Sequence, residues 1–147
     1  MLHTLDAILT TTLPWCSAAL APQLAKDGNE LCGFAVWPPG NKPWILISAD
    51  QGAEEFTRTV HHECWHIAEC MLAPETVQAV TDSLDANFEG YGEPEIYGDP
   101  SERRAVAYAA WAVLAESGLM ITNPHHPAMA TFEHVYRGNL ANSFTPS

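Results

Sequence analysis

The sequence has few basic residues and no long apolar run. Six lysines and arginines stand against eighteen aspartates and glutamates, which gives a formal net charge of −12. Binding to nucleic-acid phosphates needs clustered lysine and arginine, and an acidic surface is repelled by anionic lipids. No apolar stretch approaches the roughly 20 residues of a membrane-spanning helix. We therefore expect neither a nucleic-acid partner nor a membrane partner.

Two further absences concern the cell compartment. No lysine or arginine precedes Lys26, and Asp6 and Pro14 interrupt the first apolar pattern, which argues against a secretory signal peptide. The four cysteines contain no C-x-x-C pair, which argues against a cysteine zinc knuckle, and they resemble no disulfide framework. We expect a reduced, cytoplasmic protein.

The sequence does contain enough apolar material for one folded domain. Its 147 residues are 47% hydrophobic and 10% aromatic, which excludes disorder along the whole chain. We expect a single α+β domain over residues 1–147, with an N-terminal helical cover (1–30), a core (31–117) and a C-terminal extension (118–147). The sequence leaves the oligomeric state open.

Hydrophobic periodicity indicates the elements of this domain. Leucines at helical spacing predict helix for residues 1–26, with a break at Pro14. Residues 31–37 and 44–48 are predicted as strands that form a hairpin or lie side by side. Residues 89–99, rich in glycine, proline and tyrosine, are predicted as a loop. The other predicted helices are residues 52–72, 74–88, 101–117 and 128–137.

Residues 62–66 read His-Glu-Cys-Trp-His, an H-E-x-x-H pattern. On a helix, His62 and His66 lie about 40° apart around the axis and about 6 Å apart along it. Both imidazoles can therefore bind one tetrahedral zinc ion. Glu63 lies about 100° from His62, beside the pair, where it can act as a general base toward water. Two ligands, an open position and an adjacent base are what metal-assisted hydrolysis requires.

The segment around the motif has the pattern of an amphipathic helix. The apolar residues that fall within about 80° of one another are Phe56, Val60, Cys64, Ile67 and Met71. The neighbouring polar stripe consists of Glu55, Thr59, His62 and His66. Both motif histidines are thus expected between core and solvent, and His61 is expected to be a solvated residue at the rim. The competing interpretation is an ordinary helix with solvent-facing or hydrogen-bonded histidines.

A third protein ligand is expected, because catalytic zinc sites usually have three. The residue six positions after His66 is a leucine, which excludes the longer metzincin pattern. Glu102 is the best candidate, since it shares a helix stripe with apolar residues and a carboxylate there needs a partner. Alternatively, Glu102 belongs to a capping box with Asp99 as the cap. Asp99, Glu95 and Glu69 are the other candidate ligands, and Glu69 could instead orient an imidazole.

Two motifs together resemble the ImmA/IrrE family of zinc metallopeptidases, which is gluzincin-like. The matching residues are His62, Glu63, His66, Glu102, Ala105, Tyr108 and Ala109. The resemblance covers about residues 31–117 and implies a minimal zincin domain, in which a small sheet packs on the H-E-x-x-H helix. It implies that His62, His66 and Glu102 bind zinc and that Glu63 activates water. It also implies a strand along the cleft, with residues 44–48 as the candidate, that pairs with an extended substrate.

The function expected from these residues is zinc-dependent hydrolysis of a peptide bond in a protein or peptide substrate, with Zn²⁺ as cofactor and Glu63 as general base. The alternative is a catalytically inactive zinc-binding scaffold that serves as a protein-interaction module. A hydrolase of non-peptide amides would use the same residues. Val106 departs from the resembling family, which often has a polar residue there. Candidate oxyanion donors are Tyr91, Tyr97, His125, His126, His134 and Tyr136.

Overall fold

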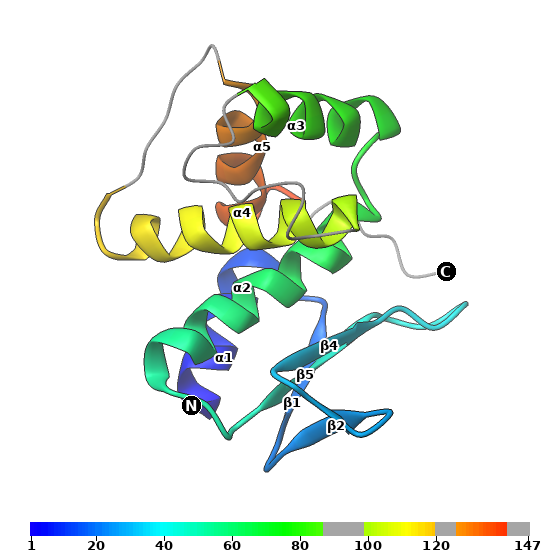
Figure 1. Cartoon of the computed structure of the whole chain (residues 1–147), viewed down its shortest axis with the longest axis vertical. Coiled ribbons are helices and arrows are strands. Elements are labelled where there is room, and N and C mark those ends of the chain that lie inside the picture. The colour runs from blue at the N-terminus through cyan, green and yellow to red at the C-terminus, as the bar shows by residue number, and fades with distance from the viewer. Residues whose placement is uncertain (87–98, 120–125, 141–147) are drawn as a thin grey trace.

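The structure is a computed structural model that describes residues 1–86, 99–119 and 126–140. Within these ranges the chain combines five helices with a small sheet, so the predicted α+β class is confirmed (Figure 1). The predicted loop over residues 89–99 lies outside the described residues, apart from its last position. The same holds for Glu95 and for three of the candidate oxyanion donors, Tyr91, Tyr97 and His125.

The later elements agree with the sequence prediction to within a few residues at each end. The strand at residues 44–48 and the helices that follow it were all predicted. The described elements are α1 (Leu2–Thr12), β1 (Ser17–Ala21), β2 (Leu24–Lys26), β3 (Asn29–Leu31), β4 (Gly33–Val36), β5 (Trp44–Ser48), α2 (Ala53–Glu69), α3 (Pro74–Ala86), α4 (Pro100–Glu116) and α5 (Pro127–Tyr136).

The prediction of helix for residues 1–26, and with it the helical cover over residues 1–30, is wrong beyond α1. Pro14 cannot continue a helix, because it has no backbone N–H. The chain instead enters β1, which pairs with β5 in parallel from Ser17 opposite Trp44 to Ala21 opposite Ser48. The alanine-rich β1 has a weak intrinsic preference for strand, so its pairing partner decides its conformation.

The three-stranded sheet has the order β1-β5-β4, which places β4 at an edge. β5 is paired on both sides, in parallel with β1 and antiparallel with β4. A strand bonded on both sides has no edge left for a substrate, so the expectation that residues 44–48 pair with a peptide is wrong. β2 and β3 form a separate antiparallel ribbon, whose turn at Asp27 and Gly28 has positive φ at both positions.

Helix α2 lies between two hydrophobic clusters and contributes to both. Cys64 and Ile67 belong to the cluster with α1 and β5, whereas Trp65 and Ala68 belong to the cluster with α3, α4 and α5. Figure 1 shows the same arrangement, with the sheet and α1 on one side of α2 and with α3, α4 and α5 on the other side. Burial of each large apolar side chain contributes roughly 1.5–3 kcal/mol. The predicted apolar stripe is confirmed for Phe56, Val60, Cys64 and Ile67, whereas Met71 lies beyond α2 and packs against the other cluster.

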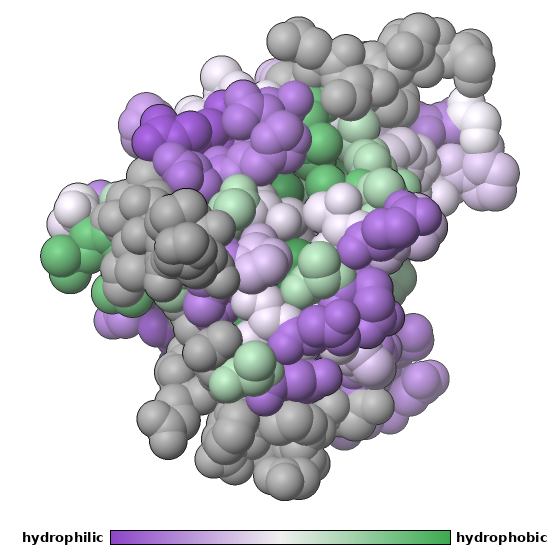
Figure 2. Space-filling view, turned by 90° about the horizontal axis from the view of Figure 1, so that it is seen from above, coloured by the Kyte–Doolittle hydropathy of each residue, from purple (hydrophilic) through white to green (hydrophobic). Residues whose placement is uncertain are grey.

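The outer surface contains hydrophilic and hydrophobic areas side by side. Figure 2 views the molecule from the α3 end, where strongly hydrophilic residues lie on two sides of a hydrophobic area. Among the described helices, none has the length and apolar character needed to cross a membrane.

Candidate metal centre

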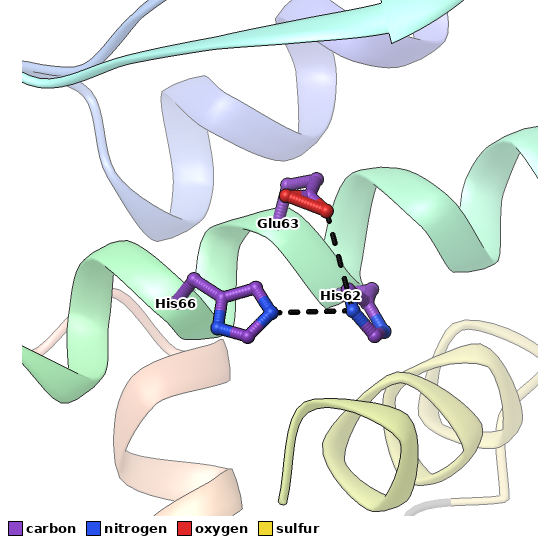
Figure 3. Close-up of side chains that lie close together, drawn as sticks. All are labelled: His62, Glu63 and His66. Atoms are coloured by element: carbon purple, nitrogen blue, oxygen red, sulfur yellow. Dashed lines mark hydrogen bonds and ion pairs between the residues drawn. The ribbon is translucent and has the colours of Figure 1, made fainter. Parts of the chain in front are cut away.

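The two motif histidines of α2 direct their Nε2 atoms toward one point. These atoms lie 3.3 Å apart, and the two rings meet edge to face with their centroids 5.0 Å apart. Both side chains are about one-fifth exposed, which leaves them at the border of the core as the helical pattern predicts. Figure 3 shows Glu63 on the same helix, extending to a different side from the line that joins the imidazoles. Its Oε1 atom is 4.0 Å from His62 Nε2.

Helix α4 brings a carboxylate to these imidazoles. Glu102 Oε2 lies 3.0 Å from His62 Nε2, and Glu102 Oε1 lies 2.8 Å from His66 Nε2. The fully buried Ala105 and Ala109 allow close packing of α4 in the core. The structure therefore brings His62, His66 and Glu102 together, although Glu102 follows His62 by 40 positions in the sequence.

The environment of Glu102 differs from the expected one. Its side chain is 47% exposed, because it lies at the open end of the helix face rather than among buried residues. The cap of α4 is Asp99, whose carboxylate accepts a hydrogen bond from the Ser101 N–H at 2.8 Å. The predicted cap is thus confirmed, while the Glu102 carboxylate is directed at the histidines. Glu69, the other described candidate ligand, bonds to Ser101 and Arg104 instead.

The donor set could hold a metal ion, and its spacing can be compared with that of a zinc site. Donor atoms about 2.0–2.1 Å from a tetrahedral zinc lie about 3.3 Å from one another. The separations among the two Nε2 atoms and the Glu102 oxygens are 2.8 to 3.3 Å, close to this value. His62, Glu63 and His66 form a group whose ligand atoms lie within 4.8 Å of one another and which could hold a metal ion. The separation of Glu63 from His62 is longer, at 4.0 Å, so Glu63 lies beside the other donors.

Glu63 is buried against the sheet. Its side chain is 9% exposed, and in the metal-free protein burial raises the pKa of Glu63 to about 8, with repulsion from Glu102 adding to the rise. Burial, with a contribution from His66, lowers the pKa of His62. Both shifts favour the uncharged form of the group, because charges are poorly solvated there. Glu63 is thus a carboxyl group with the elevated pKa that general bases often have.

A cleft of about 710 Å³ opens over these residues. One wall consists of β4 and the residues just before it, including Cys32 and the partly exposed Phe34. The opposite wall comes from α2 and the first turn of α4. Two of the six basic residues, Lys26 and Arg58, also line the cleft. The edge strand and the candidate metal ligands therefore face the same space.

Three candidate oxyanion donors within the described residues lie away from this cleft. His126 bonds through Nδ1 to Ser83 of α3 at 2.8 Å, and His134 contacts Asn139 at 3.4 Å. Tyr136 lines a second cavity of about 300 Å³. The assignment of these three residues to the oxyanion is therefore wrong. Their helix α5 packs on the α3 and α4 side of the molecule, which sequence periodicity alone does not disclose.

His61 was expected at the solvated rim, and this expectation is also wrong. The side chain is 1% exposed, and its Nε2 atom lies 2.5 Å from Glu116 Oε1 of α4. Its ring packs near Tyr108 and Tyr136. α2 is buried on two faces, so a residue turned away from the cleft meets another helix instead of water.

Sequence reasoning also missed Gly33 and Ser101. Gly33 gives β4 close access to α2, and Ser101 contacts His66 from the first turn of α4. The only available signal was weak: a glycine at the start of a strand and a serine after a helix cap.

Comparison with known proteins found no family model, no curated protein and no solved structure that matches this chain. The resemblance to zinc peptidases therefore depends on the two short motifs.

Proposed function

We propose that this protein is a zinc-dependent peptidase, with His62, His66 and Glu102 as metal ligands and Glu63 as general base. The observation that carries the proposal is the position of Glu102, whose two carboxylate oxygens meet the two imidazoles at 2.8 and 3.0 Å. Two histidines and one glutamate are the ligand set of one class of catalytic zinc sites. The H-E-x-x-H and E-x-x-A motifs of the resembling ImmA/IrrE family support the same assignment.

Zinc, when bound, supplies a Lewis acid that polarises a carbonyl and lowers the pKa of water. Glu63 removes a proton from the attacking water and delivers it to the leaving amine. The Glu63 side chain is largely buried but lines the cleft, so its carboxyl group is held near the ligands and faces the same space. β4 lies at the sheet edge and lines the cleft, so its backbone can pair with an extended peptide. Protein or peptide substrates follow from this arrangement.

A second function is favoured by one specific observation. None of the described candidate oxyanion donors on α5 lines the cleft. A zinc-binding module that only captures a protein segment along β4 needs no such donor. The two functions differ in their demand on Glu63, which hydrolysis requires and simple capture does not.

The test compares wild-type protein with Glu63→Gln and a matched control, Glu55→Gln, on the same helix. Glu55 is exposed in the first turn of α2, far along the helix from the ligands. Each protein is loaded with zinc and incubated with a diverse peptide mixture, and new termini are identified by mass spectrometry. We expect Glu63→Gln to keep its zinc and to lose roughly 10²–10⁴-fold in rate, while Glu55→Gln cleaves like wild type. Equal cleavage by Glu63→Gln would contradict the assignment, and zinc binding without any cleavage would favour the interaction module.

A further inference from the structure

A chain of hydrogen bonds extends from the second ring nitrogen of His66 into the contact between three helices. His66 Nδ1 lies 3.3 Å from Ser101 Oγ, and Ser101 Oγ donates to Glu69 Oε2 at 2.6 Å. Glu69 Oε1 accepts a hydrogen bond from Arg104 Nε. Arg104 Nη1 donates to Thr81 Oγ1 of α3 at 2.9 Å. The candidate ligand His66 is therefore connected to α3 and α4.

When His66 binds a metal, the donors and acceptors of these groups allow only one direction of donation along the hydrogen bonds. A histidine that offers the Nε2 lone pair to a metal carries its proton on Nδ1. A serine hydroxyl can accept that N–H and donate its own hydrogen onward. A carboxylate only accepts and a guanidinium only donates, so Glu69 and Arg104 fix the orientation of the hydroxyl. Each of these hydrogen bonds then joins one donor to one acceptor.

The supporting groups are held firmly in place. The Glu69 and Arg104 side chains are 13% and 12% exposed, so their ion pair is largely screened from water. Asp99 bonds to the Ser101 backbone N–H, which fixes the first turn of α4.

We propose that Ser101, held by Glu69, is a positioning residue that accepts the His66 Nδ1–H and directs Nε2 into the cleft. The inference rests on the proposed function, since it assigns His66 as a metal ligand. Partners of this kind typically change metal affinity by about 10–100-fold when they are removed. The Ser101 hydroxyl is assigned a role in metal affinity in addition to the bond that it donates to Glu69.

The test is a zinc titration in competition with a chelating dye, for wild type, Ser101→Ala, Ser101→Thr and Ser117→Ala. Ser117 provides a matched control, because the same change at the other end of α4 removes only a local bond to the Val113 carbonyl. Ser101→Ala should weaken zinc binding about 10–100-fold, and its cobalt complex should show a shifted visible absorption spectrum. Ser101→Thr keeps a hydroxyl, so it and Ser117→Ala should match wild type in both measurements.

The outcomes separate the two proposals. Wild-type affinity and an unchanged cobalt spectrum in Ser101→Ala would overturn the role of Ser101 and leave the proposed function intact. Wild type that binds no zinc would overturn both. Thermal unfolding of the metal-free variants provides the remaining comparison: Ser101→Ala should unfold only slightly below the wild-type temperature, because it loses the single bond to Glu69. A large loss of metal-free stability in Ser101→Ala, with no change in the cobalt spectrum, would assign the hydroxyl a structural role and overturn the proposal.

Discussion

Gly33 of the edge strand lies directly against Glu63 of α2. A Cβ atom at position 33 would be 2.9 Å from Glu63 Cγ and 2.8 Å from Thr59 Cγ2, both closer than such contacts allow. A glycine is therefore required for β4 to approach the proposed general base. This contact links the edge of the sheet, where a peptide could pair, to the carboxyl group that would act on it.

Substitution of Gly33 by alanine should displace Glu63 without moving the metal ligands. We expect the rate of peptide cleavage to fall at least about tenfold, because general-base catalysis depends on hydrogen-bond distance. Overpacking should reduce the free energy of unfolding by about 1–3 kcal/mol. Zinc affinity serves as the internal control and should remain at the wild-type value, since the three atoms nearest to the added methyl group belong to Thr59, Glu63 and Ile47. Unchanged cleavage by a folded Gly33→Ala variant would contradict the importance of this contact.

The stability of the metal-free protein should depend on pH through Glu63. The pKa of this group is about 8 in the folded protein, compared with 4.5 for an ordinary glutamate, so the folded state holds the proton more tightly. Its contribution to stability is fully present below about pH 4.5 and is lost as the pH rises through about 8. Glu63→Gln does not lose stability in this way, because glutamine has no proton to release in this pH range. We therefore expect urea unfolding of the two metal-free proteins to show a pH-dependent difference. The free energy of unfolding of Glu63→Gln should rise relative to that of wild type between pH 5 and pH 8.5, by on the order of a few kcal/mol. Parallel pH profiles would contradict the prediction.

His61 should matter for stability and not for metal binding. Its buried ring bonds to Glu116 and points to the opposite side of α2 from the cleft lining. His61→Ala should lower the free energy of unfolding by about 2–5 kcal/mol, through a cavity and a lost partner for Glu116. His3→Ala is the control, because His3 is exposed on α1. Urea unfolding and zinc titration are measured together, and a His61→Ala variant with native stability would show that the buried contact contributes little.

The four cysteines should divide into two reactivity classes. Cys32 and Cys70 are exposed, whereas Cys16 and Cys64 are buried as free thiols. Burial raises the pKa of the Cys16 thiol to about 12 and that of Cys64 well above its ordinary value, so neither forms the reactive thiolate at pH 8. Mass spectrometry after brief maleimide treatment should find label on Cys32 and Cys70 alone. Label on all four should appear in urea, and rapid native labelling of Cys64 would contradict the buried position of that side of α2.

The sequence predicted those parts of the structure that follow from local periodicity. The apolar stripe of α2, the limits of α4 and the cap at Asp99 each depend on residues a few positions apart. The convergence of Glu102 on His62 and His66 was predicted, although the reason given for it, a carboxylate on a buried helix face, is wrong because the Glu102 side chain is 47% exposed. The resemblance to the zinc-peptidase motifs also indicated Glu102 as the third ligand.

The failures concern contacts between distant segments. Ser17–Ala21 has a composition suited to helix, and only its pairing with β5 makes it a strand. His61 looked solvent-facing because one apolar stripe was counted, while α2 is buried on two faces. The Ser101 bond to His66 depends on how α4 crosses α2, and no spacing within either helix indicates it.

The most direct test of the central claim is the zinc content of purified protein, measured by elemental mass spectrometry for wild type, His66→Ala, Glu102→Ala and Glu55→Gln. A three-ligand site predicts about one zinc per chain in wild type and in the control Glu55→Gln. It predicts loss of the metal in His66→Ala and Glu102→Ala, with all four proteins folded by circular dichroism. Wild-type protein that stays metal-free after zinc is supplied would contradict the metal centre, and full zinc content in Glu102→Ala would contradict the ligand from α4.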